Sequence, residues 1–225
     1  KKPILAVHPS RDPLVRTLFA QAGVIRANSL EEAFDVAALL ALDRLPENNR
    51  VRLISNASGP SNLALEALRE GGLFVEHVDL GSTARAEEFA RALEEALEGE
   101  AGSVFLLFVP MGFASEEEFL ALLEKAEGNK LLLACVMGSS GVRARVRGQV
   151  ALYRFPESAA IALSRAWAYK AWREEPLHFP DFPDLRLEEA RKLLEGKKTL
   201  SQAEGAALLE CFGLPLGKGE GLSLK

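Results

Sequence analysis

The sequence predicts an α/β fold: a flavodoxin-like, doubly wound parallel sheet with a short helical C-terminal extension. Between residues 50 and 173, short apolar runs alternate with stretches that have helical periodicity. The middle runs are apolar at every position, which is typical of parallel strands buried on both faces. With 225 residues, 48% of them hydrophobic, the chain is long enough for one large domain or one domain with a smaller appendage.

Five segments are expected to form the sheet. Each is an apolar run of strand length, and they are Val51–Ser55, Phe74–Val78, Val104–Val109, Leu131–Val136 and Val150–Tyr153. Five strands in such a repeat favour the flavodoxin-like order, with a ligand crevice at the carboxyl ends of the first and third strands. Those ends are Asn56–Ser61 and Pro110–Ala114.

Helices are expected around these strands. Ser29 precedes a helix that reaches Leu42, and Ser115 precedes one that reaches Glu127. Acidic residues follow both serines, which suits the positive end of a helix dipole.

The part of the chain after the sheet is expected to be helical. A long helix covers Ser158–Arg173, a proline-containing linker follows, and two short amphipathic helices cover Leu187–Leu194 and Leu200–Phe212. The aromatic residues of the long helix are interpreted as packing contacts rather than as a platform for stacking bases. They are Trp167, Tyr169 and Trp172.

Composition excludes several classes of function. A net charge of -5 gives no reason to expect nucleic acid as a partner. The apolar runs are far shorter than the roughly 20 residues that cross a bilayer, so no membrane association is expected. With only Cys135 and Cys211, neither a disulfide framework nor a zinc site is expected, and the cytoplasm is the predicted compartment.

The segment Val51–Leu68, VRLISNASGPSNLALEAL, predicts a strand, a tight turn and a helix. The first N–H groups of a helix lack intrahelical partners and lie at the positive end of the dipole, so such a turn can hold an oxyanion. The alternative is an ordinary turn that uses Asn, Gly and Pro for its geometry. The residues predicted to face a phosphate are Asn56, Ala57, Ser58, Gly59, Pro60 and Ser61.

Several blocks together resemble the nucleoside-diphosphate-forming acyl-CoA synthetases, such as ADP-forming acetyl-CoA synthetase, which are relatives of succinyl-CoA synthetase. Their order and spacing both match. A final block resembles the segment with which fused members enter an ATP-grasp domain. The blocks are Gln21–Leu40, Asn49–Pro60, Val78–Leu93 and Val150–Leu163, and the final one is Leu200–Leu216.

The resemblance implies a ligase reaction in which acid, CoA and ATP give acyl-CoA, ADP and phosphate through an acyl phosphate and a phosphohistidine. Two helix N-termini from different domains would face each other across the phosphohistidine, and the turn Asn56–Ser61 would be one of them. Asp79 and Gly81 match a family block expected beside that turn. ATP, ADP, CoA and Mg would be used on other domains, and this chain alone is expected to bind no cofactor and no metal.

The resemblance also implies a division of the chain. Residues 1–28 would be the remnant of a preceding CoA-ligase domain. Residues 29–175 would form a flavodoxin-like domain of the succinyl-CoA synthetase type, and residues 176–225 would be a linker and helices leading toward an ATP-grasp domain. The implied partners are a CoA-binding Rossmann domain, an ATP-grasp domain or subunit, and phosphate or acyl phosphate, with homo- or hetero-oligomers also allowed.

Two departures from the family pattern leave the function open. The family's Ser-His-Thr-Gly segment is absent, and His8 falls about four residues too late to replace its histidine, so no catalytic residue is assigned. Ser58 and Ser61 replace two glycines of the family's turn. The chain is therefore either an enzyme module, incomplete by itself, or a catalytically inactive paralogue that docks or regulates. A flavodoxin-type cofactor binder is disfavoured, because no aromatic residues flank the turns.

Three further groups have two interpretations each. His77 and Asp79 share a face of a predicted strand, where the carboxylate pairs with the imidazole or both simply pack at the strand end. The arginines of GVRARVRG gather a phosphate or form a solvated loop. The glycines of MGSSG form a second phosphate loop or an ordinary turn. The arginines are Arg143, Arg145 and Arg147, and the glycines are Gly138 and Gly141.

Overall fold

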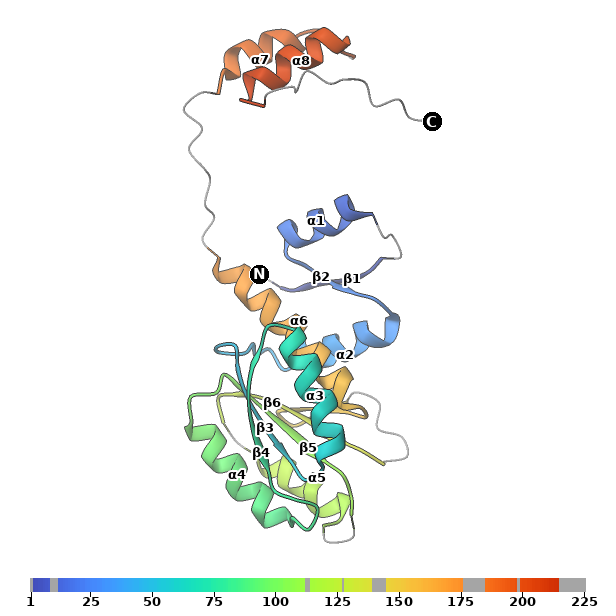
Figure 1. The fold of residues 1–225 in the computed structure, drawn as a ribbon, viewed down its shortest axis with the longest axis vertical. Helices are drawn as coiled ribbons and strands as arrows, with labels where there is room; N and C mark the ends of the chain where they lie inside the picture. The colour runs from blue at the N-terminus through green and yellow to red at the C-terminus, as the bar shows by residue number, and fades with distance from the viewer. Residues whose placement is uncertain are drawn as a thin grey trace. The chain divides into compact units, whose positions relative to one another are not determined.

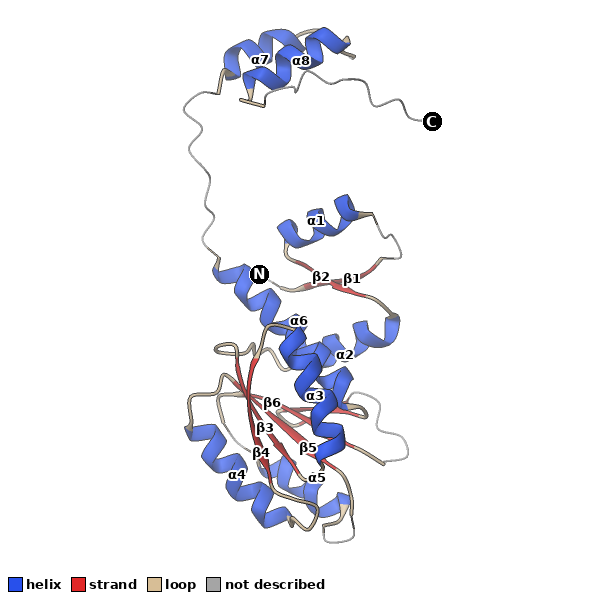
Figure 2. Cartoon of the chain, viewed as in Figure 1, coloured by secondary structure: helices blue, strands red, loops and turns tan. Residues whose placement is uncertain are grey.

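The computed structural model describes residues 2–8, 12–111, 114–126, 128–138, 145–175, 185–197 and 199–214. The chain divides into two compact units, residues 1–175 and 176–225. Figure 1 follows the chain by residue number, and Figure 2 shows its helices and strands.

A six-stranded sheet forms the centre of the larger unit in the described part of the chain (Figure 1). Its order is β4-β3-β5-β6-β8-β7, and β7 alone among these strands runs antiparallel to its neighbour. The five parallel strands have the flavodoxin-like order, which confirms the predicted fold class. The strands are β3 (Arg50–Ser55), β4 (Phe74–Asp79), β5 (Ser103–Phe108), β6 (Leu131–Val136), β7 (Arg145–Arg147) and β8 (Val150–Tyr153).

Helices cover both faces of this sheet, as Figure 1 shows. One face packs against α2 (Leu30–Leu40), α3 (Ser58–Glu70) and α6 (Pro156–Glu174). The other packs against α4 (Ala86–Glu98) and α5 (Glu116–Lys125). The sheet is therefore doubly wound.

The continuously apolar runs have a direct structural explanation. Successive strand residues point to opposite faces, so Phe105 joins the core under α3 while Leu106 joins the core under α4. Every residue of β5 and β6 is buried. Lys130, just before β6, is 8% exposed and its Nζ donates to the carbonyl oxygens of Ala96, at 3.0 Å, and Gly99. It thereby closes the C-terminal end of α4.

Among the described residues before Asn28, two strands and a helix form a small parallel arrangement that the sequence patterns did not predict. β1 (Ile4–Val7) pairs with β2 (Val24–Ala27), and α1 (Pro13–Ala22) connects them. The Asp12 carboxylate accepts the N–H of Leu14, 2.9 Å away, at the start of α1. Gly23 ends the helix with a φ of 68°, the left-handed conformation that favours glycine.

The smaller unit contains α7 (Leu187–Leu194) and α8 (Gln202–Cys211). These helices pack on each other through buried Ala190 and Cys211, and the N–H of Arg186 donates to the carbonyl of Cys211 at 3.0 Å. The linker prolines and the glycine-rich tail lie outside the described residues. Among the helices that are described, none has the length and apolar character needed to cross a membrane.

Candidate functional site

The turn between β3 and α3 lies at the carboxyl edge of the sheet. β3 ends at Ser55 and α3 begins at Ser58, with Ala57 as the N-cap residue. Alanine has no side-chain acceptor, and the first turn of α3 contains no acidic residue. Within the described residues, no hydrogen bond is found to the N–H of Ser58 or of Gly59, and both residues are exposed. These main-chain donors therefore face solvent.

The neighbouring helices at the same edge begin differently. At the start of α4, the Glu88 carboxylate accepts the N–H of Arg85 at 2.9 Å. At the start of α5, the Glu118 carboxylate accepts the N–H of Ser115 at 2.9 Å, and the Ser115 hydroxyl accepts the N–H of Glu118 at 3.1 Å. The backbone hydrogen bond from Ser115, with a smaller contribution from its hydroxyl, lowers the pKa of Glu118. Each of these two helices thus carries its own anion, whereas α3 does not.

Gly59 is not required by the packing of the turn. A Cβ atom built on this residue would meet no atom within 4 Å, and its φ is not left-handed. The space in front of this residue is therefore open to an incoming group. A backbone N–H can approach an oxyanion most closely where no side chain intervenes.

Asn56 holds the turn from inside. The residue is 2% exposed, Nδ2 donates to the carbonyl of Val109 at 2.8 Å, and Oδ1 accepts the N–H of Val109 at 2.9 Å. Val109 directly follows β5, so this pair joins the ends of two adjacent strands where the winding of the sheet reverses. The amide of Asn56 is thus occupied by an internal partner.

Ser61 also faces the interior. Its hydroxyl oxygen lies 2.6 Å from both the Ser55 hydroxyl and the carbonyl oxygen of Ala57. The Ser55 hydroxyl lies 2.8 Å from Nε2 of His77. Ser55 and Ser61 are fully buried, so the hydroxyl chain lies under the start of α3. Of the two serines that replace family glycines, Ser58 is exposed and Ser61 is not.

Asp79 and Gly81 form a tight turn at the end of β4. Asp79 is the strand partner of Ser55, and its carboxylate accepts the N–H of Gly81 at 2.9 Å. Gly81 has a φ of 79°, which favours glycine. The bond found for the His77 side chain is to Ser55 rather than to Asp79, which agrees with strand-end packing.

The other residues considered in the sequence have structural surroundings. The His8 ring packs edge-on against Phe19 with centroids 5.6 Å apart. Tyr169 stacks on Trp172, and Trp167 packs against the core, which confirms the packing interpretation. The remaining candidates, Gly141, Arg143 and the side chains of Arg145 and Arg147, lie outside the described residues.

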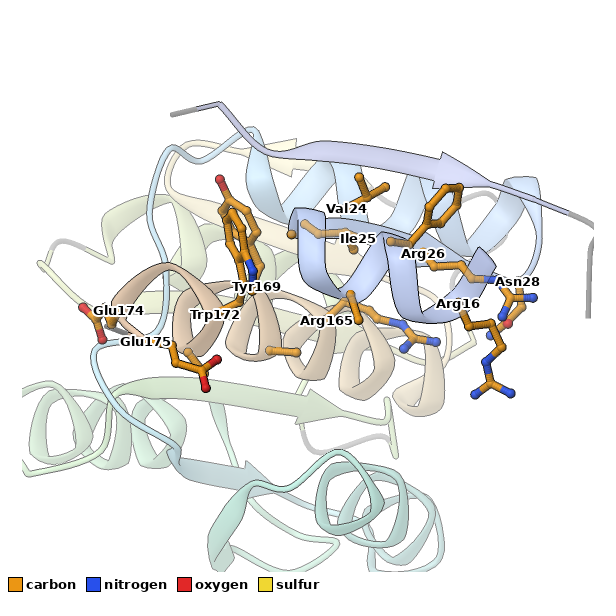
Figure 3. A pocket seen from close by; sticks show the side chains of 15 residues that line it. Arg16, Val24, Ile25, Arg26, Asn28, Arg165, Tyr169, Trp172, Glu174 and Glu175 are labelled. Carbon is orange, nitrogen blue, oxygen red and sulfur yellow. The ribbon is translucent and has the colours of Figure 1, made fainter. Parts of the chain in front are cut away.

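A cavity of about 840 Å³ was not predicted from the sequence (Figure 3). It lies among α1, β2 and α6, within the larger unit. Arginines from all three elements line it, together with Trp172. The sequence feature that could have indicated the cavity is the helical spacing of its lining residues in two distant segments. These are residues 16, 19, 20 and 23 in the first segment and 165, 168, 169 and 172 in the second.

No family model matches the chain. The 4-hydroxybutyrate–CoA ligase [ADP-forming] of Nitrosopumilus maritimus is 24% identical over 97% of this chain and 38% of its own length. Acetate–CoA ligase [ADP-forming] I of Archaeoglobus fulgidus is 28% identical over 88% of this chain and 33% of its own length. These relatives are ADP-forming acyl-CoA synthetases. They match the family that the sequence blocks resemble.

A third relative extends this comparison to separate subunits. The alpha subunit of acetate–CoA ligase [ADP-forming] I from Pyrococcus furiosus is 24% identical over 72% of this chain and 42% of its own length. The chain therefore spans between 33% and 42% of the three relatives' lengths. These synthetases include members described as subunits.

The same fold occurs in a solved synthetase structure. The dinucleotide-forming acetyl-coenzyme A synthetase 1 of Ca. Korarchaeum cryptofilum, in complex with phosphate and ADP, has a TM-score of 0.69 and 16% sequence identity. The similarity covers 80% of this chain and 50% of that one. At this identity the similarity shows a shared fold.

Proposed function

We propose that the chain is a module of an ADP-forming acyl-CoA synthetase and that the start of α3 is its phosphate-binding element. The observation that carries this proposal is the uncapped N-terminus of α3 beside two helices that carry their own acids. A helix start without an internal anion can stabilise an external one. The names of the relatives supply the class of reaction.

In this proposal the residues of the turn have different roles. The N–H groups of Ser58 and Gly59 donate to the phosphoryl oxygens, and the exposed Ser58 hydroxyl adds a third donor. Pro60 has no N–H and fixes the backbone of the first turn. Asn56 and Ser61 hold the turn in shape from inside. The Asp79 carboxylate, which accepts the N–H of Gly81, supports the neighbouring strand end.

The rest of the reaction would take place on other domains. In the proposal, residues 1–28 are the remnant of a CoA-ligase domain, residues 29–175 are the phosphate-binding module, and residues 176–225 lead toward an ATP-grasp domain. A CoA-binding Rossmann domain and an ATP-grasp domain or subunit would bind CoA, ATP and Mg. The fraction of the relatives' length that this chain spans supports such a division of labour.

Calorimetric titration with phosphate and with sulfate tests the site. Gly59→Val places a side chain in the open space before the α3 amides, and we expect at least a tenfold loss of affinity. Gly205→Val is the matched control, because Gly205 also lies in the first turns of a helix and has nothing within 4 Å, but Ser201 and Glu204 cap that helix. Equal anion binding by the wild type and by Gly59→Val would remove the assignment.

The second candidate is a docking or regulatory module without catalysis, and the absence of the His-Thr-Gly segment favours it. Incubation with ³²P-labelled acetyl phosphate and the relevant partner domains distinguishes the two. An acid-labile phosphohistidine that forms only when this chain is present supports the synthetase module. Formation of the same phosphohistidine without this chain supports the docking module.

A further inference from the structure

The cavity among α1, β2 and α6 has the size and the construction of a small-molecule site. Its volume of about 840 Å³ lies within the ~300–1,000 Å³ that is usual for ligand pockets. Val24 and Ile25 of β2 line it, and so do Ala20 of α1 and Ala168 of α6. The alanines leave room between the two helices, and the cavity therefore offers an apolar groove.

Positive charge gathers at one end of this groove. Arg16 of α1, Arg26 of β2 and Arg165 of α6 lie together there, as Figure 3 shows. Glu174 and Glu175 lie at the other end. Guanidinium groups recognise carboxylates and phosphates through paired hydrogen bonds. A ligand with one anionic end would therefore bind in a single orientation.

The positive end is held in place by a partly buried carboxylate. The Glu32 side chain is 12% exposed, and its Oε1 lies 3.0 Å from Nε of Arg165. Its Oε2 accepts both the N–H and the side-chain amide of Asn28, each at 2.9 Å. Arg165 uses Nε for this bond, so its terminal nitrogens can bind another group. Glu32 pairs with Arg165, and Arg16 of α1 adds a further positive charge at this end of the groove.

The opposite wall is equally fixed. Nε1 of Trp172 donates to the carbonyl of Gln21 at 3.2 Å. The indole ring lies so close to Gly23 that a Cβ there would come within 2.3 Å of it. Tyr169 stacks on the indole with centroids 6.0 Å apart. The walls of the cavity are thus preorganised before any ligand binds.

We propose that this cavity binds a small organic anion: a carboxylate or phosphate ester with an apolar body of about one ring. The anionic group pairs with the Arg16 and Arg165 guanidinium groups, and the apolar body lies along β2 toward Trp172. This site is separate from the α3 turn and does not depend on the proposed function.

Four probes test the chemistry by calorimetry and by tryptophan fluorescence. Phenyl phosphate and benzoate carry both required features, benzyl alcohol lacks the charge, and inorganic phosphate lacks the ring. We expect one of the two aromatic anions to bind at least tenfold more tightly than both controls. Preference for phenyl phosphate indicates a phosphate ester as the ligand class, and preference for benzoate indicates a carboxylate. Failure of both at 5 mM, or equal binding of benzyl alcohol, would overturn the proposal.

Four variants locate the binding. Arg16→Gln should weaken the preferred probe at least fivefold, while Arg91→Gln, an exposed arginine on α4, should leave it unchanged. Ala168→Phe fills the groove and should abolish binding. Gly59→Val should retain full affinity for the aromatic anion. A loss in Gly59→Val without a loss in Arg16→Gln would place the anion at α3 and refute the site described here.

Discussion

Replacement of Asn56 tests how the crevice of the sheet is held together. In Asn56→Ala, the N–H and the carbonyl of Val109 lose the partners that lie at 2.9 and 2.8 Å. An unsatisfied buried donor or acceptor costs about 1–3 kcal/mol, and Val109 is only partly buried, so we expect a loss of about 2–4 kcal/mol in the free energy of unfolding. Loss of this pair should also separate the ends of β3 and β5.

Asn56→Asp adds a pH signature to this prediction. The introduced carboxyl still accepts the Val109 N–H, but when ionised it sets a second oxygen against the Val109 carbonyl in a buried site. Its pKa in the folded state is therefore raised above the ~3.9 of an unfolded chain. The stability deficit is largest above that raised pKa, and it shrinks as the pH falls from there toward 3.9, because the protonated carboxyl can donate to the carbonyl.

Urea unfolding followed by tryptophan fluorescence measures both variants. The chain has two tryptophans, Trp167 and Trp172, and both lie on α6, so the signal reports on the larger unit alone. Asn62→Ala, an exposed asparagine on α3, is the control and should change the stability by less than about 0.5 kcal/mol. A cost below that value for Asn56→Ala, or an Asn56→Asp deficit that is equal at pH 7 and pH 4, would refute the reasoning.

Four other perturbations have defined outcomes. Lys130→Met removes the donor that closes α4 and should cost about 1–3 kcal/mol in urea unfolding. Burial raises the pKa of Cys135 to about 12, so iodoacetamide should label this thiol only as fast as the unit unfolds, as followed by peptide mass spectrometry. Burial raises the pKa of Asp35 above its ordinary value of 3.8. The free energy of unfolding therefore falls as the pH rises from 3.8 through the raised value. Asp35→Asn removes this effect, so its melting temperature should exceed that of the wild type by more at pH 7 than at pH 3.5. Gly23→Ala places a Cβ atom on a residue with a φ of 68° and against the Trp172 ring. The free energy of unfolding should fall by about 2–4 kcal/mol, and the tryptophan emission should shift.

The central sheet could be predicted because burial on two faces leaves a strong mark on a sequence. Leu131–Val136 and Val150–Tyr153 were found with the observed bounds. β7 was missed because three residues containing two arginines have no apolar pattern. The first 27 residues were missed although Asp12 with Pro13 and Gly23 are start and stop signals for α1.

The position of the candidate turn could be predicted, but the directions of its side chains could not. The spacing of small residues after a strand locates the start of α3. Ser61 faces the interior because of its hydrogen-bond partners, and one partner, Ser55, lies on the preceding strand. The Asn56 pair spans 53 residues, and the arginine cluster of the cavity spans about 150. Contacts of this kind are set by tertiary packing and leave no local periodicity.

The hydroxyl chain beneath α3 has only a few allowed proton arrangements. A hydroxyl has one hydrogen to donate, so each of Ser55 and Ser61 must choose one acceptor. If Nε2 of His77 carries a hydrogen, it donates to Ser55, and all three contacts are then hydrogen bonds only if Ser55 donates to Ser61 and Ser61 donates to the Ala57 carbonyl. Neutral imidazole with its hydrogen on Nδ1 allows the reverse direction. The position of the hydrogen on the His77 ring thus decides the direction of the hydroxyl dipoles at the entrance of the helix, without movement of any heavy atom.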